Sequence, residues 1–333
     1  MSKSGNPFKE YIDLAQPRLG SEVVYASDDF FAAKERMIDP AAPVFIDGKF
    51  DDNGKWMDGW ESRRKRGPGY DYSIIRFGVP GKIAGVDIDT THFTGNFPPA
   101  ASLQACVSDQ TVPEESAWVS VHDSLKLEGN SHHYLEIADD QVYTHLRLNI
   151  YPDGGIARLR VYGIVQASPE TLQTSGLIDL LAMENGGRAL ICNDEHFGSM
   201  HNLNAPGRGI NMGDGWETAR RRVPGNDWVV LALGQAGIVE KIEIDTAHFK
   251  GNYPDRVSIQ AAYVSGGVAE SIATQSLYWD SLLAEQKLQM DKQHYFTELN
   301  ADMGVISHIR VNIFPDGGIS RVRLHGRVQG KTS

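Results

Sequence analysis

Three short segments of this chain combine chemically active side chains, and each of them occurs twice. The first, Asp89-Thr-Thr-His92-Phe-Thr-Gly-Asn96, places a carboxylate, an imidazole and an amide within eight residues. Such a set could act as a general acid and base beside a hydrogen-bonding amide. The alternative is a strand end closed by Asx and Thr turns, with a histidine held by structural hydrogen bonds. The second copy carries Asp245, His248 and Asn252.

The second segment joins an aromatic ring to a carboxylate. Asp58-Gly-Trp60-Glu61 is followed by basic residues, and Asp214-Gly-Trp216-Glu217 repeats it. In a loop over a ligand, the tryptophan would contact the ligand and the glutamate would serve as an acid or base. The structural alternative is a tryptophan that plugs one end of a β-sandwich, with the arginines paired to nearby acids. Both interpretations stay open at this point.

The third segment carries arginines on strand faces. His145, Arg147 and Asn149 share one face of a predicted strand, and the second copy has His308, Arg310 and Asn312. An arginine flanked by polar groups suits a small carboxylate, because its planar fork binds both oxygens. The next strand adds two arginines in each copy, and together they predict a cationic sheet face. The alternative for each strand is a solvated outer face. These added residues are Arg158, Arg160, Arg321 and Arg323.

Familiar catalytic signatures are missing from the sequence. It contains no GxSxG, GxxxxGK[ST], GxGxxG or HExxH pattern, so we expect no covalent serine or cysteine mechanism. His132-His133 with Glu136 is superficially like a cupin ligand set, but the spacing is not met, and the second copy keeps only His294. The sequence therefore requires no cofactor, while a site for a divalent metal such as manganese stays open.

A tandem duplication positions these segments. The first two segments recur at an offset of 156 residues and the third at an offset of 163, in the same order. We therefore predict one repeat over residues 13–166 and a second over residues 179–330. The intervening residues 167–178 are polar and contain Pro and Gly, which is typical of a linker.

Each repeat has the pattern of an all-β domain. Apolar and polar residues alternate from residue 82 to 90, from 144 to 151 and from 156 to 161, which indicates half-buried strands. We interpret residues 144–163 as a hairpin that turns at Pro152-Asp-Gly-Gly155. Helical signals are few, the best at residues 276–290 and a short one at 28–33. Antiparallel domains of this size fit a sandwich or jelly roll.

Composition limits the classes of protein. The 333 residues include 43 acidic and 32 basic side chains, giving a formal charge of −11, which argues against nucleic acid or an anionic membrane as partner. The length suits two domains. Two cysteines, Cys106 and Cys192, make no disulfide framework. The first residues lack the apolar core of a signal peptide, and no apolar run approaches 18 residues, so we expect a soluble, cytoplasmic protein.

These doubled motifs resemble the allantoicase family. The resemblance rests on DGWE, IDTxHFxGNxP and RxNIxPDGGIxRxRxxG, each present twice in this order, and it covers residues 13–330. It implies two jelly-roll domains of the galactose-binding-like type. It also implies hydrolysis of allantoate to ureidoglycolate and urea, in the use of purines as a nitrogen source, by a homo-oligomer.

Matching that reaction to the residues gives a working assignment. An arginine would bind the substrate carboxylate, an amide would hold the ureido groups, and a histidine with its aspartate would move protons. The glutamate and tryptophan of the DGWE segment would act as reserve acid or base and as a binding surface. In order, these residues are Arg147 and Arg310, Asn96 and Asn252, His92 and His248, Asp89 and Asp245, Glu61 and Glu217, and Trp60 and Trp216.

Two questions stay open on the sequence alone. One is the class of function, since a tandem module that binds a sugar or a metal-dependent hydrolase of another amide could use the same residues. The other is whether both repeats are active. Residues 43–54 of the first repeat have little counterpart in the second, which has residues 202–209 instead, so we expect the two copies to differ.

Overall fold

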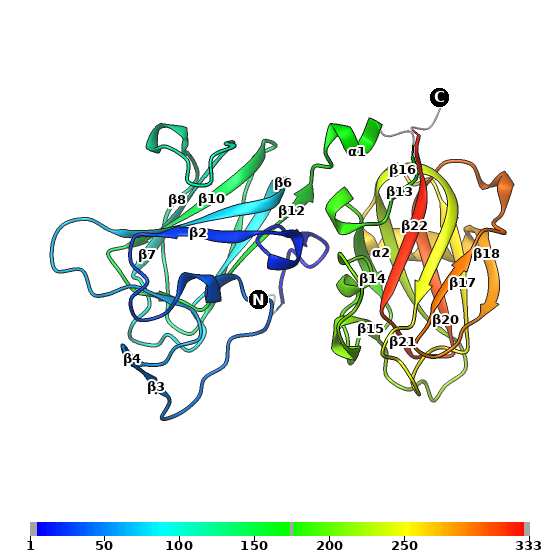
Figure 1. Ribbon diagram of the computed structural model, residues 1–333, viewed down its shortest axis with the longest axis horizontal. Helices are drawn as coiled ribbons and strands as arrows, with labels where there is room; N and C mark the ends of the chain where they lie inside the picture. The colour runs from blue at the N-terminus through cyan, green and yellow to red at the C-terminus, as the bar shows by residue number, and fades with distance from the viewer. Residues whose placement is uncertain (1–4, 174–175, 330–333) are drawn as a thin grey trace. The chain divides into compact units, whose positions relative to one another are not determined.

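The chain folds into two compact units in a computed structural model that describes residues 5–173 and 176–329 (Figure 1). The first unit ends at Gln166 and the second begins at Ala167. Helix α1 (Pro169–Gln173) lies in the segment 167–178 that the sequence marks as a linker. Residues 174 and 175 of that segment, and residue 330 of the predicted second repeat, lie outside the described residues.

One long strand organises the first unit. Strand β6 (Asp71–Asp89) has 19 residues. Its first half pairs with β2 (Glu22–Ala26) and with β10 (Val142–Tyr151). Its second half pairs with β12 (Arg158–Val165) and with β9 (His132–Glu136). Because β6 runs through both halves of the antiparallel sheet, it joins the two layers of a jelly-roll sandwich.

The sheet is completed by β7 (Ala100–Cys106) beside β10, by β8 (Val119–Lys126) at one edge and by β1 (Ile12–Asp13) at the other. The second unit repeats this order around β16 (Asp227–Asp245). Its other sheet strands are β13 (Ile178–Asp179), β14 (Arg188–Cys192), β17 (Arg256–Ala262), β18 (Asp280–Lys287), β19 (Gln293–Phe296), β20 (Ile306–Phe314) and β22 (Arg321–Val328).

Short elements close the ends of the sandwiches. The two-residue strands are β3 (Phe50–Asp51), β4 (Gly54–Lys55), β5 (Trp60–Glu61), β11 (Gly155–Ile156), β15 (Trp216–Glu217) and β21 (Gly318–Ile319). The second α-helix is α2 (Ala269–Gln275). The 3-10 turns are η1 (Pro17–Leu19), η2 (Lys34–Ile38), η3 (Glu115–Ala117), η4 (Met183–Asn185), η5 (Met200–Asn202), η6 (Met212–Asp214), η7 (Ser276–Tyr278) and η8 (Ala301–Met303).

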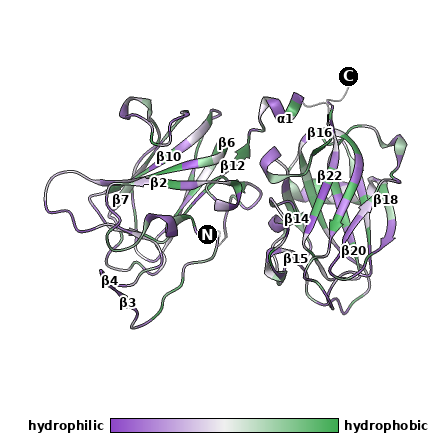
Figure 2. Cartoon of the chain, viewed as in Figure 1, coloured by the Kyte–Doolittle hydropathy of each residue, from purple (hydrophilic) through white to green (hydrophobic). Residues whose placement is uncertain are grey.

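Alternation along the strands builds the core. In the second unit, side chains from both halves of β16 meet in one apolar cluster, which includes Leu231 from the first half and Ile244 from the second. Figure 2 shows that hydrophobic and hydrophilic residues are interspersed along the strands. These contacts confirm the predicted all-β fold and its duplication. Within the described ranges, no helix is long and apolar enough to cross a membrane.

Three local predictions are wrong. Residues 144–163 do not form a hairpin, because β10 and β12 each pair with β6, which lies between them in the sheet order. Residues 276–290 are mostly strand β18 instead of helix, and the helix of this region, α2, precedes them. Residues 28–33 form bends and one isolated bridge, and the 3-10 turn η2 begins only at Lys34.

Candidate active site

The three repeated segments meet at one end of the first unit. Strand β5 of the DGWE segment pairs with β11, which begins at the last residue of Pro152-Asp-Gly-Gly155. The backbone N–H of Gly155 donates to the carbonyl of Asn96 over 2.7 Å, which brings in the segment Asp89–Asn96. A Cβ on Gly155 would lie 2.0 Å from the ring of Phe93. This glycine is therefore needed for the close approach of the two loops.

A cleft of about 480 Å³ opens where these loops meet. Within it, the side-chain amide of Asn96 donates to the Glu61 carboxylate over 2.8 Å. Burial raises the pKa of Glu61, although the hydrogen bond from Asn96 opposes that shift. A glutamate with a raised pKa can hold a proton closer to neutral pH, as a general acid must.

Cationic and aromatic side chains complete this first cleft. Arg64 and Lys126 bring positive charge, and Phe31 and Phe97 form apolar walls. Asp153 also lines the cleft, and its carboxylate accepts the backbone N–H of Lys65 over 2.7 Å. The cleft therefore offers an acid, an amide and cations to a small anionic ligand.

The second unit builds the same cleft, with a volume of about 530 Å³. The amide of Asn252 donates to the Glu217 carboxylate, as Asn96 does to Glu61. Arg220, Phe197, Tyr253 and Asp316 take the places of Arg64, Phe31, Phe97 and Asp153 in the lining. All three repeated segments therefore converge on one cleft in each unit.

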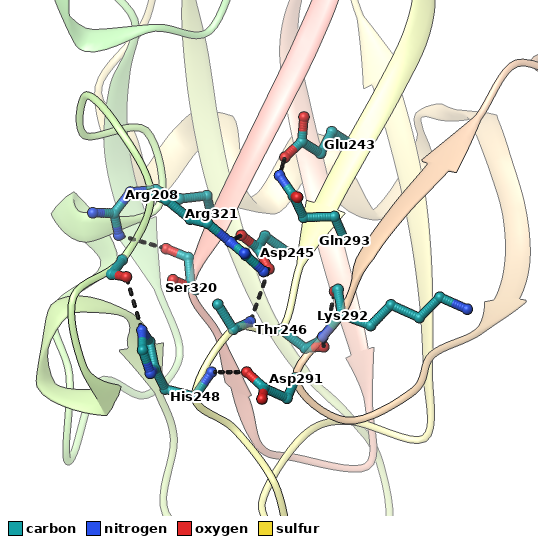
Figure 3. A network of polar contacts seen from close by, with 12 residues as sticks. Arg208, Glu243, Asp245, Thr246, His248, Asp291, Lys292, Gln293, Ser320 and Arg321 are labelled. Carbon is teal, nitrogen blue, oxygen red and sulfur yellow. Dashed lines mark hydrogen bonds and ion pairs between the residues drawn. The ribbon is translucent and has the colours of Figure 1, made fainter.

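The predicted histidines lie outside the lining of both clefts. His92 has a positive φ of 69°, and its Nε2 lies 3.2 Å from the carbonyl oxygen of Pro43. His248 has a φ of 72°, and its Nε2 lies 2.8 Å from the carbonyl oxygen of Gly209 (Figure 3). Each histidine thus ties two loops together, in line with the structural alternative.

The aspartates that precede them close strand ends. Asp89 is buried and accepts the backbone N–H of Thr91 over 2.8 Å. Asp245 accepts the backbone N–H of Ala247 over 2.9 Å and pairs with Arg208, whose Nε lies 2.9 Å from its Oδ2 (Figure 3). These contacts are Asx turns at the ends of β6 and β16. Neither aspartate lines the cleft of Glu61 or Glu217, although Asp245 lines a separate pocket of about 340 Å³.

Arg147 and Arg310 also lie away from the clefts. Arg147 is 3% exposed, stacks 4.0 Å from the ring centre of Tyr72, and donates to Glu115 over 2.7 Å. Arg310 is 5% exposed and stacks 4.2 Å from the ring centre of Trp228. Aromatic rings and hydrogen-bonding side chains of the protein thus contact the two guanidinium groups where a substrate carboxylate would have to bind.

The arginines of the predicted cationic face are divided between the two halves of the sheet, and Arg321 and Arg323 line a separate pocket in the second unit. Arg147 lies on β10, which pairs with the first half of β6, whereas Arg158 lies on β12, beside the second half. Arg158 is buried and pairs with Asp58, with Nη2 2.8 Å from Oδ2. Arg321 and Asp214 form the same pair at 2.8 Å in the second unit. These ion pairs anchor the loop that carries Glu61 or Glu217.

The two tryptophans are part of the fold's interior. Trp60 and Trp216 are fully buried. The indole N–H of Trp60 donates to the carbonyl of Asp28, and that of Trp216 to the carbonyl of Asp194, each over 2.8 Å. They therefore hold the adjacent glutamates in place and are not exposed to a ligand.

Comparison with known proteins identifies the family. A family model described as the allantoicase repeat matches residues 12–166 and again residues 178–329. The chain belongs to the allantoicase family.

Relatives match nearly the whole chain. A probable allantoicase 1 of Burkholderia mallei is 60% identical over 319 residues, which cover 96% of this chain and 95% of that protein. A probable allantoicase of Pseudomonas fluorescens is 58% identical and covers 97% of this chain and 98% of its own length. The crystal structure of Saccharomyces cerevisiae allantoicase aligns with a TM-score of 0.81 at 37% identity, over 95% of this chain and 92% of that one.

Sequence reasoning did not single out the cations that line the two clefts. Arg64 and Arg220 line equivalent positions, yet we assigned them no role. A signal was present, because the two arginines match at the 156-residue offset of the DGWE segment. Lys126 gave no such signal, since it lies far from every repeated motif.

The histidine pair of the first repeat has structural partners. His132 Nδ1 lies 2.8 Å from the Asp87 carboxylate, and His133 Nε2 accepts the backbone N–H of Glu128. Burial opposes protonation of His132, but Asp87 outweighs it and raises the pKa of this histidine. Among residues 5–173 and 176–329, no group of three or more His, Cys, Asp or Glu side chains could hold a metal ion.

Proposed function

We propose that this protein hydrolyses allantoate to ureidoglycolate and urea, and that the corresponding clefts of the two units are its active sites. The family membership supports the reaction. One observation carries the location: in each unit, three motifs from distant parts of the sequence meet around a hydrogen-bonded Glu–Asn pair.

The cleft residues match the groups of the substrate. Allantoate has a central carbon that bears a carboxylate and two ureido groups. Arg64 or Arg220 would bind the carboxylate, because a guanidinium can donate to both oxygens. The amides of Asn96 and Asn252 would hydrogen-bond a ureido group, and Phe97 or Tyr253 would pack against its flat face.

The proposed reaction needs no protein nucleophile. Protonated Glu61 gives its proton to the nitrogen of the departing urea as the bond from that nitrogen to the central carbon breaks. The lone pair on the remaining ureido nitrogen forms a double bond to the carbon, which leaves a cationic imine. Water then adds to the carbon, and its released proton returns to the Glu61 carboxylate. The products are urea, ureidoglycolate and regenerated acid.

The burial of Glu61 serves this cycle. A carboxyl group of ordinary pKa is ionised near neutral pH and has no proton to give. Burial raises the pKa of Glu61, and Asn96 fixes one oxygen, so the other oxygen can face the leaving nitrogen. The same carboxylate then acts as the base that takes a proton from the attacking water, so one residue serves as both acid and base.

Substitution of both glutamates tests the proposal. Glu61→Gln/Glu217→Gln keeps the shape of each cleft and its hydrogen-bonding side chains but removes the transferable proton. We expect urea release from allantoate to fall by about 10²- to 10⁴-fold, the usual worth of acid–base catalysis. Glu136→Gln, at an exposed glutamate of β9, is the matched control. Normal turnover by the double variant would refute the proposed sites.

The same assay addresses the metal question. The proposed chemistry uses only protein groups and water, so we expect urea release to persist after chelation. Loss of activity on chelation, restored by manganese, would replace this mechanism with a metal-assisted one. We also propose, from the low cysteine count and the family resemblance, a homo-oligomer in the cytoplasm, which light scattering on the purified protein and fractionation would check.

A further inference from the structure

The two clefts carry different charges. Two cations and two carboxylates line the first cleft: Arg64, Lys126, Glu61 and Asp153. Two cations and three carboxylates line the second: Arg220, Arg221, Glu217, Asp255 and Asp316. An anionic substrate therefore meets a more negative lining in the second unit.

The extra carboxylate comes from one position. Asp255 occupies the place of Pro99 at the 156-residue offset, and both residues line their clefts. Asp255 lies 3.0 Å from Nε of Arg256 and 3.9 Å from Nζ of Lys287. Lys287 is the strand counterpart of Lys126, since these lysines pair with Arg256 and with Ala100 at matching positions. Lys287, the counterpart of the lysine that lines the first cleft, therefore lies near Asp255 and does not line the second cleft.

The cations of the second cleft are also less available. Arg221 donates to Asp227 with Nη1 2.7 Å from Oδ1, and its Nη2 donates to the carbonyl of Pro224. Lys65, the counterpart of Arg221 in the first unit, pairs with Asp71 in the same way but does not line the cleft. Among residues 5–173, no ion pair or side-chain hydrogen bond involves Arg64 or Lys126. The first cleft therefore has two cations that can turn to a ligand, and the second has Arg220.

The apolar wall differs as well. The backbone N–H of Phe31 donates to the backbone carbonyl of Glu61. The N–H of Phe197 donates to that of Glu217 in the same way. Beside Phe31 lies the hairpin of β3 and β4, whose Gly54 would place a Cβ 3.8 Å from the Phe31 ring. Phe197 lacks this hairpin and is 62% exposed. Ordering the wall on ligand binding therefore costs less side-chain entropy in the first unit.

From these differences we infer that the two active sites are unequal: the first cleft binds anionic substrate more tightly and carries most turnover at low allantoate, with Lys126 and Asp255 setting the difference. This inference rests on the proposed function. Each exposed charge contact changes binding by up to about fivefold. The KM for allantoate at the first cleft should therefore be about five- to twentyfold lower than at the second.

Single-site variants of the full chain separate the two clefts. Glu217→Gln leaves the first cleft active, and Glu61→Gln leaves the second. We expect the lower KM in Glu217→Gln, with a difference that shrinks as salt is added, because exposed charges are screened. Equal KM values, or the lower value in Glu61→Gln, would overturn the inference while leaving the proposed function intact. Full activity in Glu61→Gln/Glu217→Gln would instead overturn the proposed function.

Charge substitutions assign the cause. In the Glu61→Gln background, Asp255→Asn should lower the KM about fivefold with little change in kcat. In the Glu217→Gln background, Lys126→Met should raise it by a similar factor. Asp302→Asn, at an exposed aspartate of η8, is the control and should change neither value. An unchanged KM in both charge variants would overturn the role of these residues.

A binding measurement removes the dependence on turnover. Titration of allantoate into Glu61→Gln/Glu217→Gln, followed by calorimetry, should resolve two classes of site with dissociation constants at least about fivefold apart. A single class of two equivalent sites would overturn the inference even if a charge variant failed to fold. Near-ultraviolet circular dichroism of each variant checks that its tertiary packing is retained.

Discussion

Arg158→Met should strongly destabilise the first unit. The Arg158 side chain is 3% exposed, and its guanidinium donates to the carbonyl of Ala41 over 2.8 Å and to the carbonyl and carboxylate of Asp58 over 3.1 and 2.8 Å. Burial opposes ionisation of Asp58, but the hydrogen bonds from Arg158 and Val44 outweigh it and hold the pKa of Asp58 below its usual value. Methionine would fill much of the space and leave the aspartate charge without its partner.

The magnitude follows from that stranded charge. Removing one member of a buried ion pair costs about 3–5 kcal/mol, because the remaining charge stays desolvated. At about 1.4 kcal/mol per factor of ten, this corresponds to roughly 10²- to 10³-fold or more in the opening equilibrium. An exposed pair is worth at most about 1 kcal/mol, so Arg76→Met is the control in the same unit. Arg76 lies 3.4 Å from Glu22, and both side chains are exposed.

Hydrogen exchange read by mass spectrometry measures the effect unit by unit. Peptides from β6 should lose about 10²-fold or more of their protection in Arg158→Met, while peptides from β16 in the other unit stay unchanged. Adding Asp58→Asn should restore part of the loss, because it neutralises the stranded carboxylate. Protection of β6 within a few-fold of the parent, or a loss as large in Arg76→Met, would refute this reasoning.

Three further predictions concern single positions. Burial, with repulsion from Arg188, lowers the pKa of His308 to about 4, so the unfolded chain binds a proton at a higher pH than the folded chain does. The second unit should therefore lose up to about 3 kcal/mol of stability as the pH falls from about 6.5 to about 4. In urea unfolding, His308→Gln should flatten this pH dependence. Gly155→Ala should cost about 1–3 kcal/mol and lower urea release, because its Cβ would meet the Phe93 ring at 2.0 Å, whereas Gly67→Ala, with nothing within 4 Å, should change neither melting temperature nor activity. Arg147→Met should lower the melting temperature without raising the KM for allantoate, and a raised KM in a variant of normal stability would return this arginine to the substrate site.

The sequence is sufficient for the parts of the fold that depend on local pattern. Alternation marks β10, β12 and the end of β6, and the repeated motifs show the duplication. Strand pairing depends on long-range packing, which is why the hairpin prediction failed: the partner between β10 and β12 comes from residues 71–89. The helix expected at residues 276–290 failed because pairing of β18 with β17 overrides a weak local preference.

The candidate site also has parts that residue type and spacing predict and parts that depend on long-range packing. Glu61 and Asn96 are both visible as candidates, but they lie 35 residues apart, and only the fold shows that they share a hydrogen bond. His92 and Arg147 have the residue types that suit the reaction, but His92 has a positive φ, Arg147 stacks on Tyr72, and neither lines the cleft of Glu61. Those constraints are conformational, so residue type and spacing do not reveal them.

Within each repeated motif, some residues line the cleft and others hold the loop that carries them. In the DGWE segment, Glu61 faces the cleft, while Trp60 and the Asp58–Arg158 pair fix the loop that carries it. Because the buried indole and the glutamate belong to adjacent residues, a movement of either support must move the carboxylate that we propose transfers protons. Loss of activity in a support variant is therefore weak evidence for a catalytic role. The stronger evidence is a changed KM or pH profile at unchanged stability, which we expect for Arg64 and Glu61 and not for Arg158.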